Sequence, residues 1–360
     1  MTAEYHRLGD YIREVNVRNR ELKVTDPMGI NIDKHFMPSV ANVIGTDLST
    51  YKLVSKNQFA CNLMHVGRDE KIPMAMQTDD NPIIVSPAYF VFEVTKTDEL
   101  LPEYLMMWFC RKEFDRNAWF YTDADVRGGL DKEALMDMQL PVPSIERQRE
   151  IVSENETLTR RIRLNNQMIE KLEATAQALY RHTFVDNIDK QNLPEGWRMG
   201  TLGEISEVNS GKTCSDKVDS KSEIYKYPVA GASGVIGFSS TYNYDEKLMT
   251  TGRVGTLGIV NRYSQPMYMA DNVLVMRSQY FEYCYQILRN FDYSEITKGG
   301  VQSLITQTDL KESAIIIPSK DILNKFEEQS KSMYTMVEQK QQENTKLTEL
   351  QSLLLAKMGQ

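Results

Sequence analysis

The sequence of 360 residues is poor in the side chains from which catalytic and metal sites are usually built. It contains only four cysteines and four histidines. The cysteines are scattered without a C-x-x-C pair, which is typical of reduced thiols and not of disulfides or zinc sites. No histidines lie at metal-ligand spacing, and no Ser-His-Asp or Cys-His arrangement is recognisable. The sequence therefore favours a binding protein over an enzyme.

Long apolar runs are also missing. No stretch approaches the ~20 residues that are needed to span a bilayer. The first ten residues lack the basic and apolar regions of a secretion signal. We therefore expect a cytoplasmic protein without a membrane partner.

Positive charge is not in surplus. The formal net charge is −8, and acidic residues outnumber basic ones in both of the larger segments, 1–143 and 193–318. If the protein binds a nucleic acid, it must therefore use a local stripe of basic residues, with help from partner subunits.

Nucleotide-binding motifs are absent as well. Gly211-Lys212-Thr213 resembles the end of a P-loop, but the glycine that the motif requires five residues earlier is replaced by Ser206. The glycines of "GRVGTLG" around Arg253 are spaced by three and do not form a dinucleotide fingerprint, so a turn is the better interpretation. We expect no cofactor on this chain.

An internal repeat is the main positive feature. The phrase "LGDYIREVN" (8–16) returns as "LGEISEVN" (202–209), and further landmarks return in the same order. These are an apolar stretch that begins with Glu-Tyr, a glycine pair, and a run that ends in Pro-Ser. From the last landmark onwards the halves align without gaps at an offset of 175 residues. The chain therefore has the organisation A–B–A′–B′.

The B segments are predicted to be long helices. Residues 144–184 contain no glycine or proline, and apolar residues recur there with the 4-3 spacing of a coiled coil. The repeat supplies two such helices, so an antiparallel pair is the simplest arrangement, and the alternative is two helices that each pack on their own module. The predicted seam comprises Ile151, Leu158, Ile162, Asn165, Ile169, Leu172, Leu179, Phe326, Met333, Val337, Leu347 and Leu354.

The A segments are predicted to be mixed modules rich in short strands. Thr201-Leu-Gly-Glu204 is a capping box at the start of a short helix, which we expect to end at Ser210-Gly211. Short β-like runs follow, separated by glycine, serine and asparagine. The expected fold class is α+β, with segments at 1–143, 144–192, 193–318 and 319–360.

At this point the sequence resembles a known family. "LPEGWRMGTLGEISEVNSGKT" (193–213) is similar to the opening of a target-recognition domain in the specificity subunits of type I restriction–modification enzymes. "LPVPSIERQREIV" before a long helix resembles the family's central conserved spacer, and 318–358 resembles the distal one. In the distal copy Glu146 and Gln148 are replaced by Asp321 and Leu323, so the two helix starts are not expected to hold partners equally.

The resemblance implies a function. Each module, 1–143 and 193–318, would read one half of a bipartite site in double-stranded DNA. The helices within 144–192 and 319–360 would set the spacer and dock two methyltransferase subunits for adenine N6 methylation, and motor–nuclease subunits would add restriction. The chain itself would be non-catalytic, with S-adenosylmethionine, ATP and Mg²⁺ bound by its partners. The remaining alternatives are a scaffold of duplicated protein-binding modules on a coiled coil and an enzyme with an unrecognised active site.

Candidate DNA contacts are polar and basic residues at turns beside the β-runs and around the glycine pairs. Arginine can read guanine and glutamine can read adenine through paired hydrogen bonds. His65 and Arg253 take the same repeat position if Gly67 is aligned with Gly255. The predicted set is His65, Arg68 and Arg127 in the first module, and Lys212, Arg253, Lys298 and Gln302 in the second.

Overall fold

The chain folds into two compact units. The computed structural model describes residues 4–40, 45–64, 66–122, 128–186, 188–254, 257–296 and 304–358. One unit is Met1–Asn165 with Gln342–Gln360, and the other is Asn166–Gln341. Each unit combines one predicted module with parts of both long helices, so the units cut across the four predicted segments. No helix within the described ranges is long and apolar enough to cross a membrane.

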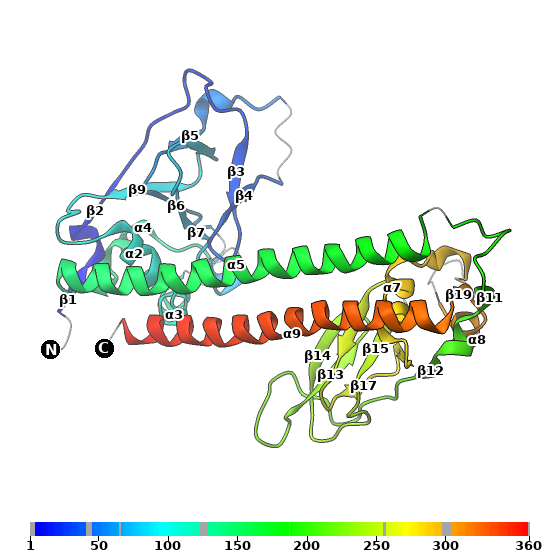
Figure 1. Cartoon of the computed structure of the whole chain (residues 1–360). Helices are drawn as coiled ribbons and strands as arrows, with labels where there is room; N and C mark the ends of the chain where they lie inside the picture. Colours follow the sequence, from blue (N-terminus) through cyan, green and yellow to red (C-terminus); the bar gives the residue numbers. More distant parts are fainter. Residues whose placement is uncertain are drawn as a thin grey trace. The chain divides into compact units, whose positions relative to one another are not determined.

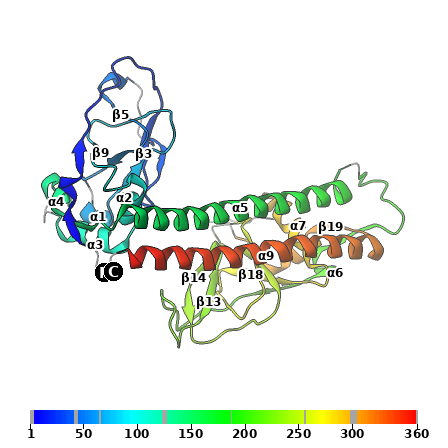
Figure 2. The ribbon, with the colours of Figure 1, turned by 60° about the vertical axis from the view of Figure 1, so that its left-hand side comes forward.

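The two predicted long helices are confirmed. They are α5 (Ile145–Phe184) and α9 (Lys320–Lys357), which run side by side in Figures 1 and 2. The Ser144 side chain accepts a hydrogen bond from the Arg147 backbone N–H at 3.4 Å and so caps the start of α5.

The first unit holds small sheets with short helices packed against them. Its remaining helices are α1 (Val66–Asp69), α2 (Pro102–Phe109), α3 (Lys112–Phe120) and α4 (Lys132–Asp137), with 3-10 turns η1 (Leu8–Asp10) and η2 (Leu48–Thr50). Its strands are β1 (Tyr5–Arg7), β2 (Ile12–Glu14), β3 (Pro27–Ile30), β4 (Phe36–Pro38), β5 (Lys52–Val54), β6 (Gln58–Cys61), β7 (Met74–Met76), β8 (Ile83–Val85), β9 (Phe90–Val94) and β10 (Gln139–Pro141). The strand orders are β1-β10, β2-β9-β6-β7 and β4-β3-β8-β5.

The second unit repeats this design. Its remaining helices are α6 (Leu202–Ile205), α7 (Phe281–Asn290) and α8 (Gln307–Lys311), with the 3-10 turn η3 (Tyr293–Glu295). Its strands are β11 (Arg198–Thr201), β12 (Glu207–Ser210), β13 (Tyr227–Gly231), β14 (Gly234–Ser239), β15 (Leu248–Gly252), β16 (Val260–Tyr263), β17 (Tyr268–Met269), β18 (Val273–Arg277) and β19 (Ala314–Ile317). The orders are β11-β19, β12-β18-β15-β16 and β14-β13-β17.

Equivalent contacts confirm the internal repeat. β3 pairs parallel with β8 in one unit, and β13 pairs parallel with β17 in the other. Two further contacts recur with acceptors 175 residues apart, which is the offset expected from the sequence. Leu8 N–H donates to Met138 O and Leu202 N–H to Ser313 O, while the Tyr104 hydroxyl donates to Pro141 O and the Tyr283 hydroxyl to Ile316 O.

One local prediction was wrong. The capping box is present, with the Glu204 carboxylate accepting from Thr201 N–H at 2.7 Å. However, α6 ends at Ile205 and does not reach Ser210, because Glu207–Ser210 forms β12 and pairs with β18. This pairing is non-local, so it overrides the local helix signal.

The long helices contribute to both cores. Ile151 of α5 and Met358 beyond α9 are buried in the core of the first unit, whereas Tyr180, Phe184 and Phe326 are buried in the core of the second. The helices also bond to each other at Asn165 and Asn344, so pairing between helices and packing on the modules occur together.

Candidate nucleic-acid interface

In the four-stranded sheet of the second unit, β12 and β15 end where β18 begins, so three strand ends form one edge of the sheet. Ser210, the last residue of β12, pairs with Leu274, and Gly252, the last residue of β15, pairs with Val273 at the start of β18. Lys212 and Arg253 lie just beyond these strand ends. Two predicted DNA contacts from separate sequence motifs are therefore brought to the same edge of one sheet.

Arg253 is held by its backbone on both sides. Its N–H donates to Asn272 O at 2.9 Å, and its carbonyl accepts from Ile305 N–H at 3.0 Å. The side chain is half-buried, and its Nε has no hydrogen-bond partner among the described residues. Buried donors are normally satisfied, so the unpaired Nε makes Arg253 a candidate for a ligand contact at the sheet edge.

Lys212 is exposed on a loop whose path is fixed by the preceding glycine. A Cβ on Gly211 would lie 2.0 Å from Ala270 O, so only glycine fits this close approach of two backbones. Lys212 N–H then donates to Met269 O at 2.9 Å. The P-loop-like Gly211-Lys212-Thr213 is thus a packing feature, and it leaves the Lys212 side chain exposed.

Arg68 is the described candidate of the first module. It lies on α1 with a side chain that is 66 % exposed, and its Nε bonds to the Asp69 carboxylate at 2.7 Å. Gly67 N–H donates to Gly128 O at 2.7 Å, and a Cβ on Gly67 would lie 2.8 Å from Gly128 Cα. Gly128 of the predicted glycine pair therefore lies in direct contact with the backbone of α1.

The remaining candidates, His65, Arg127, Lys298 and Gln302, lie outside the described residues. The predicted equivalence of His65 and Arg253 rests on His65 and Gly255, which also lie outside the described residues, so it stays a prediction. Leu130 N–H donates to Leu63 O, and Ile305, which is 175 residues further on, donates to Arg253 O. In this backbone contact Leu63 takes the place that Arg253 has in the second module.

Gln148 anchors the first module to α5. Its side chain is fully buried, its Oε1 accepts from Leu101 N–H at 2.9 Å, and its Nε2 donates to Glu99 O and Pro143 O. It thereby caps the start of α2. The replacement of Gln148 by Leu323 in the other repeat therefore changes a contact inside the module. It does not change a surface that a partner could bind.

The second module uses Glu327, one turn further along its helix. The Glu327 carboxylate accepts from Glu282 N–H at 3.0 Å and from Tyr283 N–H at 2.8 Å, which caps the start of α7. Burial raises the pKa of Glu327 to about 7, although the two backbone hydrogen bonds act to lower it. The alignment at offset 175 pairs Gln148 with Leu323. It therefore does not reveal that Glu327, four residues further on, provides the cap in the second module.

The raised pKa predicts a pH dependence of stability. Because the folded unit holds the Glu327 proton up to about pH 7 and the unfolded chain releases it near pH 4.5, stability should fall between these values and level off above them. Over this pH range the free energy of unfolding should fall by roughly 3 kcal/mol, at 1.36 kcal/mol per pKa unit. Amide hydrogen exchange of α7 should therefore be faster at pH 8 than at pH 5 after correction for intrinsic rates. Glu327→Gln should flatten this dependence, whereas Glu328→Gln, at an exposed neighbour, should retain it; equal slopes in both variants would contradict the assignment.

Polar residues interrupt the coiled coil near its middle. The Asn165 amide donates to Asn344 Oδ1 at 2.9 Å, and Arg161 bonds to Glu343 at 2.6 Å. Asn165 is buried, as is typical of a polar residue that fixes register at some cost in stability. All twelve predicted seam residues are buried or half-buried.

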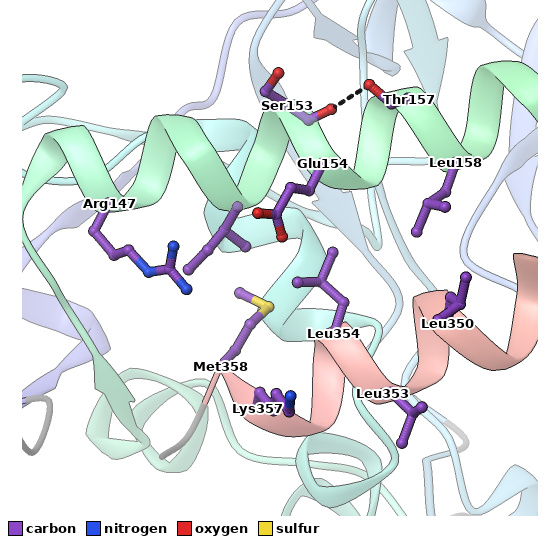
Figure 3. A pocket seen from close by; sticks show the side chains of 11 residues that line it. Arg147, Ser153, Glu154, Thr157, Leu158, Leu350, Leu353, Leu354, Lys357 and Met358 are labelled. Atoms are coloured by element: carbon purple, nitrogen blue, oxygen red, sulfur yellow. Dashed lines mark hydrogen bonds between the residues drawn. The ribbon is translucent and has the colours of Figure 1, made fainter.

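An apolar groove of about 600 Å³ lies between α5 and α9 within the first unit (Figure 3). Ile151, Leu158, Leu354 and Met358 line its floor, while the side chains of Leu350 and Leu353 are 51 % and 58 % exposed. Its rim carries charged groups from both helices, namely Arg147, Glu154 and Lys357. The groove thus combines an apolar lining with charged groups from both helices. In the part of the chain that the structure describes, no three His, Cys, Asp or Glu side chains are grouped to hold a metal ion.

The chain resembles known proteins along most of its length. Residues 194–351 match the family model of the type I restriction modification DNA specificity domain. The specificity subunit of type I restriction enzyme MjaIX from Methanocaldococcus jannaschii is 23% identical over 330 residues, covering 77% of this chain and 72% of that protein. The HindI specificity subunit from Haemophilus influenzae is 21% identical over 378 residues, covering 79% and 82%.

A solved structure has the same fold. The S subunit of the type I restriction–modification system from M. genitalium aligns with a TM-score of 0.62 at 15% identity, covering 99% of each chain. The fold, the domain match and the named relatives agree with the resemblance seen in the sequence. Over most of its length the chain is therefore similar to specificity subunits of type I restriction–modification systems, and residues 194–351 match the DNA specificity domain of that family.

Proposed function

We propose that each module reads one half of a bipartite DNA site, and that the paired helices set the number of base pairs between the halves. This proposal rests on the repeat of one module on two long helices. Two similar DNA-binding modules match a recognition site that has two parts. Lys212, Arg253 and Arg68 are the described groups that we assign to DNA. Arginine reads guanine edges in the major groove, and lysine holds phosphates.

We further propose that the groove between α5 and α9 docks a methyltransferase subunit. Its exposed Leu350 and Leu353 and its charged rim suit an amphipathic helix of a partner. Two methyltransferase subunits would then bring S-adenosylmethionine for adenine N6 methylation, and motor–nuclease subunits would bring ATP and Mg²⁺ for restriction. A complex that acts on the chromosome would lie in the cytoplasm. The acidic balance of the chain is compatible with this role because the partners share the phosphate contacts.

Exchange of one module tests the proposal. Residues 1–143 are replaced by those of a related subunit with a different site, from a donor that also carries glutamine at the position of Gln148, so that the cap of α2 is kept. The complex with its methyltransferase should then modify a site in which only one half has changed, since each module has its own core. Sequencing of methylated DNA from the host measures this. A change in both halves, or no sequence-specific methylation by the unaltered complex, would contradict the proposed function.

A further inference from the structure

We propose that Asn272 is a base-reading residue of the second module, and that its amide recognises an adenine beside the base read by Arg253. This inference rests on the proposed function and assigns a specificity-determining residue within the same site. Sequence reasoning had selected Arg253 and Lys212 but not Asn272.

The strand register places Asn272 between the two predicted contacts. In the antiparallel pair of β15 and β18, Gly252 lies opposite Val273, so Arg253 lies opposite Asn272, and their backbones are joined by the 2.9 Å hydrogen bond. Side chains directly opposite in an antiparallel pair project from the same face and are neighbours. On the other side of β18, Gly211 N–H donates to Val273 O, which brings Lys212 to the same edge.

Two side-chain atoms at this edge lack hydrogen-bond partners among the described residues. Asn272 Oδ1 and Arg253 Nε are both buried, and neither has a hydrogen bond among the described residues. The neighbouring Asp271 differs, because its Oδ2 accepts from the Thr213 hydroxyl at 2.7 Å. Leaving a buried donor or acceptor unsatisfied costs free energy, and both side chains are only half-buried, so a turn of either side chain would bring its unsatisfied atom to a ligand at the sheet edge.

The chemistry of the amide selects the ligand. Asn272 Oδ1 is an acceptor, and a phosphate oxygen offers it no donor, so the DNA backbone does not satisfy it. Adenine presents an amino donor at N6 beside an acceptor at N7 in the major groove, which matches the acceptor and donor of an asparagine amide. Arg253 has only donors and suits guanine, whereas the exposed Lys212 suits a phosphate.

The test uses the complete complex with its methyltransferase and the methylated sequence as readout. Asn272→Ala should relax one position of one half-site, with roughly ten- to hundredfold weaker discrimination there, and should leave the other half-site unchanged. Asn272→Asp keeps the shape but loses the donor, so its preference should move from adenine towards cytosine. Lys212→Ala should weaken binding to all sequences and reduce the salt dependence of binding, as expected for a phosphate contact.

Asn261→Ala is the matched control. Asn261 lies opposite Thr250 on β16, so strand alternation places it on the other face of the same sheet, and its Nδ2 also lacks a partner among the described residues. This variant should keep the wild-type motif. An unchanged motif in Asn272→Ala, or uniformly weaker binding without a change at one position, would overturn the assignment of Asn272. That result differs from failure of the proposed function, in which the wild-type complex itself shows no bipartite motif.

Discussion

Deletion of residues 162–168 together with 341–347 is expected to shorten the gap in the recognised site by about three base pairs. One heptad spans about 10 Å at 1.5 Å per residue, and DNA rises 3.4 Å per base-pair step. The two heptads lie opposite each other, because Asn165 bonds to Asn344, and both asparagines are removed together. The half-site letters should not change, since neither heptad contributes a residue to the module cores.

The shortened complex should also bind less tightly. Loss of three base pairs turns one half-site by about a third of a revolution around the duplex, at ~10 base pairs per turn. Sequencing of methylated DNA, or a footprint if methylation is lost, gives the gap.

Two controls separate the effect of helix length from the effect of the polar pair Asn165–Asn344. Asn165→Leu with Asn344→Leu removes the polar pair at unchanged length and should keep the original gap. Deletion of 162–168 alone leaves Asn344 without Asn165 and should impair assembly. An unchanged gap after the double deletion would show that the helices do not measure the spacer.

Replacement of Leu350 and Leu353 by aspartate is expected to reduce methyltransferase binding by more than a hundredfold. Both leucines are more than half exposed in the chain alone, so their loss should not affect folding. In a complex each would bury its exposed half, which contributes about 0.8–1.5 kcal/mol, and a buried aspartate would add a desolvation cost; tenfold in affinity corresponds to about 1.4 kcal/mol. Copurification and DNA methylation measure the effect.

The control for the groove is Leu164→Asp. Leu164 is 46 % exposed on α5 but is not among the residues that line the groove. This variant should assemble and methylate as the wild type does. Equal loss in both variants, or normal assembly of the Leu350 and Leu353 double variant, would place the docking surface elsewhere.

The helical parts of the fold follow from local sequence. Residues 144–184 contain neither glycine nor proline and carry a 4-3 apolar pattern, and α5 begins at Ile145 and ends at Phe184 as that pattern predicts. The burial of Asn165 was also predictable from its place in the ladder, although its partner Asn344 required the helices to be aligned in three dimensions.

The binding surface was less predictable because it depends on register between distant strands. Arg253 and Lys212 were selected as basic residues at turns, but Asn272 gains its importance only from lying opposite Arg253 across β15 and β18. β12 was missed for the same reason, since Glu207–Ser210 becomes a strand through pairing with residues about 67 positions away. Likewise, nothing local indicates that Glu327 replaces Gln148 as the cap of a module helix.

The anchoring of each module helix by its long helix has a consequence for recombination between related genes. A crossover between residues 144 and 147 would join an incoming α2 to a resident Gln148, so the new junction works only if the two were already compatible. The equivalent boundary in the second half lies beyond Glu327, because that carboxylate caps α7. Functional hybrids should therefore carry crossovers inside the long helices, past these two residues, and new specificities would be inherited together with the first turns of the helix that follows each module.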